Sequence, residues 1–129
     1  MNQITLLEFC QVPQNRIKLM ERLIYQLETK RQYYLCWILN YDFLEFKVEH
    51  NIENKGYCIG SIESKEYVHR LTYFLLSDLL PELVKYKHRK PNYMKSQDVW
   101  FYVDTITDHQ EIRIEALTNA INDIKNNLL

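Results

Sequence analysis

The chain contains only two glycines, Gly56 and Gly60, among its 129 residues. Phosphate-binding loops and the sharp turns that present a nucleophile use glycine because it adopts positive φ at little cost. The sequence also holds ten tyrosines, five phenylalanines and two tryptophans, which suit packing and contact surfaces. A codon bias typical of AT-rich bacterial or mobile-element genomes would account for part of the glycine scarcity. We still expect the function to reside in surfaces rather than in glycine-framed loops.

Length and charge limit the class of protein further. A chain of this length is expected to form one domain, residues 1–129. Hydrophobic residues make up 47% of it, enough for a substantial core. The net charge of −1 gives no overall attraction to nucleic acid or to a membrane. The start lacks the basic and apolar regions of a signal peptide, and no apolar run approaches the roughly 20 residues that span a bilayer.

The three cysteines, Cys10, Cys36 and Cys58, are odd in number and form no CxxC pair. Each lies in an apolar stretch, so we expect buried free thiols in a reducing compartment. Neither a metal nor a cofactor is predicted from their spacing. Together with the absence of a leader, this predicts a cytoplasmic protein.

The first half of the chain predicts one helix and several strands. Residues 4–10 and 57–62 are short apolar runs, and residues 44–49 alternate apolar and polar side chains, so all three are predicted strands. Residues 15–31 show helical spacing after Pro13, which is tolerated in a first turn. Residues 33–39 are apolar at both odd and even positions, which predicts a strand buried on both faces. Continuation of the helix is the alternative.

The second half predicts two helices and one strand. Residues 65–83 carry an apolar stripe that Pro81 interrupts near residues 77–78, and residues 99–103 read as a strand. Asp108 and Glu111 have the spacing of a capping box before a closing helix. The order β-α-β-β-β-α-β-α predicts an α+β fold, a single domain with a mixed, mainly antiparallel sheet of about five strands and three helices.

A basic and aromatic segment at residues 85–95 is the sharpest local anomaly, because it contains no acid. Cations could bind phosphates or an acidic protein, and the tyrosine rings could stack on bases. The alternative is an ordinary helix C-terminus, where cations complement the helix dipole. The candidate residues for nucleic acid or an acidic partner are Lys85, Tyr86, Lys87, Arg89, Lys90, Tyr93 and Lys95.

Acidic residues gather around the last predicted strand and helix. They would contact a basic partner, although capping and the end of a strand explain several of them equally well. A small enzyme is an alternative, in which Asp104, Asp108 and His109 would form part of an active site near residues 104–111. The candidate acidic contacts are Asp98, Asp104, Asp108, Glu111 and Glu115.

No catalytic motif accompanies these segments. The sequence contains neither a GxSxG elbow nor a phosphate loop nor a dinucleotide fingerprint. The leading hypothesis is a non-catalytic cytosolic protein that binds another protein and blocks or regulates it, as inhibitors and immunity proteins do. A nucleic-acid-binding regulator is the first alternative and a small enzyme the second. The 3-4 spacing of the apolar stripe over residues 114–128 is also compatible with a homodimer.

Overall fold

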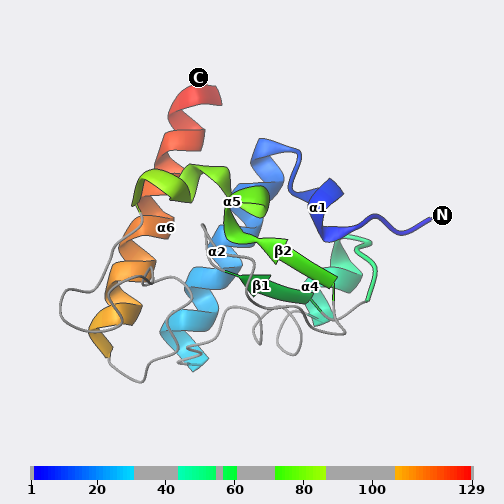
Figure 1. Cartoon of the computed structure of the whole chain (residues 1–129), viewed down its shortest axis with the longest axis horizontal. Coiled ribbons are helices and arrows are strands. Elements are labelled where there is room, and N and C mark those ends of the chain that lie inside the picture. The colour runs from blue at the N-terminus through cyan, green and yellow to red at the C-terminus, as the bar shows by residue number, and fades with distance from the viewer. Residues whose placement is uncertain (1, 31–43, 55–56, 61–71, 87–106, 129) are drawn as a thin grey trace.

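The computed structural model of the chain describes residues 2–30, 44–54, 57–60, 72–86 and 107–128. The strands predicted at 33–39 and 99–103 lie outside these residues. Helices account for most of the described chain, and two short strands form one sheet within it (Figure 1). In chain order the elements are α1 (Leu6–Phe9), α2 (Pro13–Lys30), α4 (Leu44–Glu49), β1 (Tyr57–Gly60), β2 (Thr72–Leu75), α5 (Leu76–Leu79), the 3-10 helix η2 (Pro81–Tyr86) and α6 (Thr107–Leu128).

The predicted α+β fold with about five mainly antiparallel strands is wrong. The described residues are mainly helical, and their one sheet pairs β1 with β2 in parallel, from Tyr57 opposite Thr72 to Gly60 opposite Leu75. β1 falls within a predicted strand, but residues 72–75 were expected to be helical. Their sequence Thr-Tyr-Phe-Leu has a β-branched and two aromatic residues, a local preference that the longer helical pattern obscured.

Residues 44–49 form helix α4 rather than the predicted strand. Over only six residues, alternation is ambiguous, because positions 44 and 48 also share one helical face while position 46 lies nearly opposite. Leu44 and Val48 are accordingly exposed, whereas Phe46 is buried. Lys47, next to Phe46, is buried as well, so the alternation of apolar and polar residues does not separate the buried side of this short helix from its exposed side.

Residues 4–10 also differ from the predicted strand. Ile4 makes an isolated parallel bridge with Ile52, and the chain then enters helix α1. Thr5 and Glu8 form a capping box, in which each side chain accepts a hydrogen bond from the other residue's backbone N–H, both at 3.0 Å. The T-x-x-E signal was available in the sequence. The predicted box at Asp108 is wrong, because α6 begins at Thr107 and places Asp108 inside the helix.

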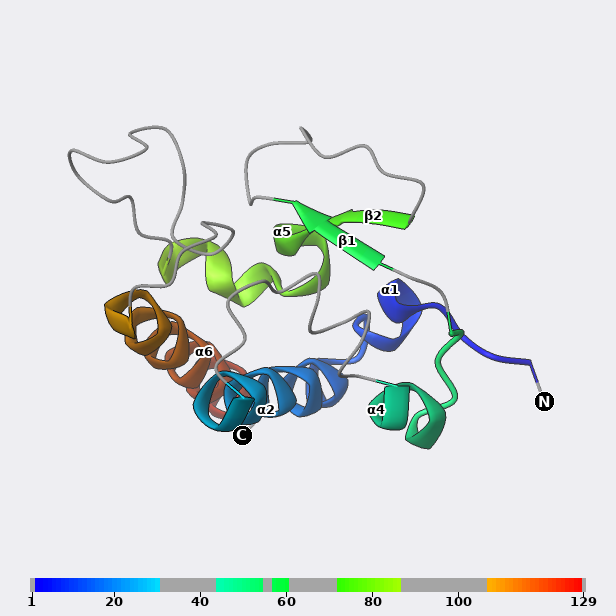
Figure 2. The ribbon, with the colours of Figure 1, turned by 90° about the horizontal axis from the view of Figure 1, so that it is seen from below.

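The two long helices are confirmed, and they contact each other along the core. Figure 2 shows two layers, with α6, α2 and α4 on one side and the β1–β2 pair with α5 and η2 on the other. Pro13 opens α2 as expected, and Pro81 opens η2, with Leu80 between it and α5. The centre of the core comprises Leu19, Met20, Leu23 and Leu27 of α2 with Ala116, Leu117, Ala120, Ile121 and Ile124 of α6.

Arg16, in the first turns of α2, ties three elements together. Its Nε and Nη2 donate to Oε1 and Oε2 of Glu82 in η2, at 2.9 and 2.7 Å. Its Nη1 donates to the backbone carbonyl of Cys10, just after α1, at 2.8 Å. The two paired side chains are only 14% and 20% exposed, so the fork-like pairing is shielded from water.

Asn51 ends α4 in the left-handed conformation, with φ of 56°. The N–H of Ile52 donates to the carbonyl of Lys47 at 2.8 Å, and the N–H of Asn51 donates to that of Val48 at 3.3 Å. This is a Schellman motif, whose left-handed position is usually glycine and sometimes asparagine. In a chain so poor in glycine, asparagine takes the position. Its Nδ2 also donates to the carbonyl of Asn2 at 3.0 Å, which holds the N-terminal segment against this turn.

We expect substitutions at Asn51 to separate the backbone cost from the side-chain bond. Asn51→Ala should lower the free energy of unfolding by about 1–2 kcal/mol, because alanine resists positive φ and the bond to Asn2 is lost. Asn51→Gly loses the same bond but adopts the conformation freely, so its loss should be smaller. Urea denaturation measures both. If Asn51→Gly destabilises the protein as much as Asn51→Ala, the left-handed conformation is not what selects asparagine.

Candidate functional site

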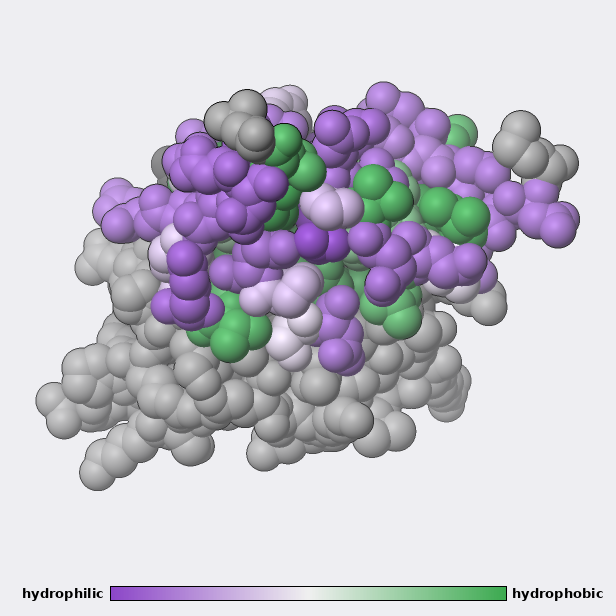
Figure 3. Space-filling model, turned by 90° about the horizontal axis from the view of Figure 1, so that it is seen from above, coloured by the Kyte–Doolittle hydropathy of each residue, from purple (hydrophilic) through white to green (hydrophobic). Residues whose placement is uncertain are grey.

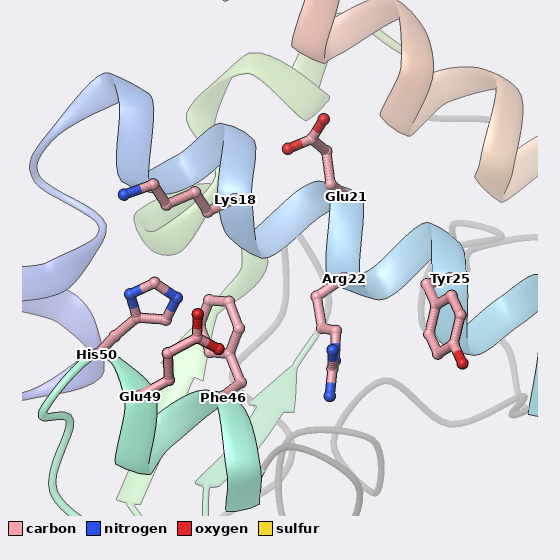
Figure 4. Close-up of a pocket in the computed structure, with 7 residues that line it drawn as sticks. All are labelled: Lys18, Glu21, Arg22, Tyr25, Phe46, Glu49 and His50. Carbon is pink, nitrogen blue, oxygen red and sulfur yellow. The ribbon is translucent and has the colours of Figure 1, made fainter.

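A hollow of about 490 Å³ lies between α2 and α4 (Figure 4). Three residues of its α2 wall, Lys18, Arg22 and Tyr25, are spaced three or four apart and so share one face of that helix, and Glu21 precedes Arg22 at the edge of this face. Its other wall is α4 and the residue that follows it. The lining residues are Lys18, Glu21, Arg22 and Tyr25 from α2, with Phe46, Glu49 and His50.

Three packed rings fix α4 next to the hollow. Phe9 of α1 meets Phe46 edge to face, with ring centroids 5.6 Å apart and planes at 83°. The His50 ring lies 4.4 Å from Phe46 and 5.1 Å from Phe9, centroid to centroid. Such tilted and edge-to-face pairs are favourable because the positive ring edge meets the negative face. The floor of the hollow is therefore a supported aromatic cluster.

His50 is held toward its neutral form by this environment. Burial lowers the pKa of His50 below its usual 6.5, Glu49 opposes the shift by raising it, and Lys18 lowers it further. The imidazole thus packs as an aromatic ring in the cluster near neutral pH.

Arg22 is the central cation of the hollow. In Figure 4 its side chain extends from α2 toward α4, whereas Glu21 extends away to the other side of α2. The guanidinium carbon lies 5.6 Å from the centroid of the Tyr25 ring, and Nη2 lies 3.6 Å from Oε2 of Glu45. That separation is longer than a hydrogen bond. Within the described part of the chain, Arg22 makes an ion pair and a ring contact but no hydrogen bond.

The predicted acidic contacts are only partly described. Asp98 and Asp104 lie outside the described residues, and Asp108 lies in the first turn of α6. Glu111 and Glu115 are exposed one helical turn apart, so they share a face of α6. Neither lines the hollow. The enzyme alternative has Asp108 and His109 on α6, while its third residue, Asp104, is among those not described.

The predicted basic segment begins with two residues that contact the chain itself. Lys85 Nζ lies 2.8 Å from Asp123 Oδ2, and the Tyr86 hydroxyl donates to the same oxygen. Both hydrogen bonds lower the pKa of Asp123, and the one from Lys85 has the larger effect. The two residues join η2 to α6, and the Lys85 side chain remains 64% exposed. The remaining candidates, Lys87, Arg89, Lys90, Tyr93 and Lys95, lie outside the described residues.

The hollow was missed because one of its walls was predicted wrongly. The polar face of α2, with Lys18, Glu21 and Arg22, follows directly from helical spacing. With residues 44–49 read as a strand, nothing placed Phe46, Glu49 and His50 beside that face. A helical reading of 44–49, with Asn51 as the residue that ends it, would have given the sequence signal.

Apolar surface patches, metal-ligand clusters and membrane-spanning helices would each be a further functional feature among the rest of the described residues. Figure 3 shows one face on which the described residues are mostly hydrophilic, with apolar residues in separate small patches. Over the described ranges, no group of three or more His, Cys, Asp or Glu could hold a metal ion. Among the helices that are described, none combines the length and apolar character needed to cross a membrane. The apolar stripe of α6 that is compatible with a homodimer has Leu117, Ile121 and Ile124 buried in the chain's own core.

Comparison of the chain with protein-family models, with curated proteins and with solved structures finds no match.

The lowered pKa of His50 predicts a specific loss of stability in acid. Because the folded-state pKa lies below the unfolded value near 6.5, the unfolded chain binds more protons below that pH. The contribution of His50 should be complete above pH 6.5 and fall as the pH drops toward 5. We expect the free energy of unfolding to decrease more over this range in the natural chain than in His50→Phe, which keeps a ring in the cluster. Equal decreases in the two proteins would contradict this account of His50.

Proposed function

We propose that this chain is a non-catalytic protein-interaction module, and that its contact surface is the hollow between α2 and α4. The module binds another protein and blocks or regulates it by covering a functional surface of that partner. This is the mode of action of inhibitors and immunity proteins, and the assignment to that class is an analogy.

The observation that carries the proposal is the cation–π pair of Arg22 and Tyr25 beside a buried aromatic floor. Tyr25 is 51% exposed on α2, and Phe46 beneath the hollow is 5% exposed. Tyrosine and arginine are enriched among residues that dominate binding energy, especially where packed neighbours support them. Around this centre, the exposed charges of Lys18, Glu21 and Glu49 form the polar rim that protein interfaces usually have.

The packing around the hollow supports binding without a large rearrangement. α4 is held by the ring cluster with Phe9 and by the turn at Asn51, and α2 is held by the core and by Arg16. A preorganised surface loses less conformational entropy on binding than a flexible one.

We further propose that the protein acts in the cytoplasm. The Cys10 thiol is free and buried, and burial raises its pKa to about 12. A thiol in that state is a poor nucleophile and packs as a small apolar group, which suits a reducing compartment.

A site-specific photocrosslinker tests the proposed surface. The photoreactive amino acid p-benzoylphenylalanine would replace Tyr25 in one variant and Glu115, on the exposed face of α6, in a matched control. In the native host, we expect the position-25 variant to crosslink to a discrete protein that the position-115 variant does not capture. Crosslinks from position 115 alone, or none from position 25, would contradict the proposal.

A further inference from the structure

Arg22 presents hydrogen-bond donors that the described chain does not use. Its side chain is 31% exposed, and its charged neighbour, Glu45, is 91% exposed and 3.6 Å away. A guanidinium offers five N–H donors in a rigid, planar fork that matches the two oxygens of a carboxylate. The 3.6 Å contact with Glu45 does not form the paired hydrogen bonds that this geometry allows.

We infer that Arg22 binds a carboxylate of the partner protein, supplied by an aspartate or glutamate side chain or by a C-terminus. This inference rests on the proposed function, because it names the chemistry that the α2–α4 hollow recognises. The partner's carboxylate takes the place of the distant Glu45 and forms paired hydrogen bonds with the guanidinium.

The surroundings of Arg22 favour this role. The Tyr25 ring lies beside the guanidinium, and such a contact orients the planar cation without using its N–H donors. Lys18 lies one turn earlier on the exposed face of α2 and lines the same hollow. Its positive charge adds to the attraction for an anion that enters between the helices.

The surrounding acids select the kind of anion. Glu49 lines the hollow, and Glu45 adjoins it through Arg22, while Glu21 borders the hollow with its side chain extending to the other side of α2. A doubly charged phosphate or a nucleic-acid backbone meets more repulsion from these carboxylates than a single carboxylate does. The hollow therefore suits one carboxylate presented by a protein segment, rather than a polyanion.

Glu45 has a distinctive part in the inference, because it competes with the partner for Arg22. Exposed ion pairs contribute little, about 0–1 kcal/mol, so a better-placed carboxylate displaces it readily. Removing Glu45 should strengthen carboxylate binding, whereas removing Arg22 should abolish it. Opposite effects from two neighbouring residues distinguish a specific site from general electrostatic attraction.

The test is an NMR titration of the full chain with N-acetylglutamate N-methylamide, which carries one carboxylate. We expect the side-chain Nε–Hε signal of Arg22 and the amide signal of Tyr25 to shift with millimolar probe. Arg22→Gln should weaken binding at least about tenfold, and Arg22→Lys, which keeps the charge but loses the fork, by about threefold. Glu45→Gln should tighten binding by about two- to threefold.

Matched controls come from α6. Glu115→Gln and Lys125→Gln remove the same charges from exposed positions on another element and should leave the affinity within about 1.5-fold, because water and salt screen distant surface charges. The amide spectrum of each variant reports whether the fold is retained. Inorganic phosphate and N-acetyllysine N-methylamide serve as the competing probes.

Three results would overturn the inference. They are no shift at Arg22 with the carboxylate probe, tighter binding of phosphate than of the carboxylate, or a weaker site in Glu45→Gln. If the photoreactive residue at position 25 still crosslinks to a discrete protein in that case, the proposed function stands and only the carboxylate assignment fails. If Arg22 binds the probe but position 25 crosslinks nothing, the site is a carboxylate site without the proposed interface.

Discussion

The arrangement of the described chain depends on the guanidinium of Arg16. By donating to both carboxylate oxygens of Glu82 and to the carbonyl of Cys10, it holds α1, α2 and η2 in one arrangement. The Cys10 carbonyl follows α1, where helical carbonyls lack partners within the helix. Partial burial strengthens these bonds, and it also makes the loss of either partner costly, because the other would remain shielded from water without one.

The position of α1 on α2 also determines how the hollow is formed. With α1 fixed on α2, Phe9 lies where it can pack edge to face on Phe46 and against the His50 ring. Those contacts set α4 beside the polar face of α2, and the turn at Asn51 joins the end of α4 to the N-terminal segment. The exposed pair of Arg22 and Tyr25 thus stands on a surface supported by buried contacts. A preorganised surface of this kind loses less conformational entropy when it binds.

The two long helices were predictable from the sequence, whereas several of the short elements were not. α2 and α6 each repeat their apolar positions over several turns, so helical spacing identified both. α4 has only six residues, a length over which alternation fits a helix as well as a strand. β2 lay inside a longer helical pattern, and its parallel partner is separate in sequence, so local reasoning could not pair them. Asn51 shows how a chain with two glycines still ends a helix in the left-handed conformation.

The central claim is that this protein works through the face formed by α2 and α4. Hydrogen–deuterium exchange, measured with and without the protein captured at position 25, tests it most directly. The account predicts slower exchange over residues 18–25 and 45–50 in the complex, with no change over residues 111–122 of α6. Protection concentrated on α6, with the α2–α4 face unchanged, would contradict it.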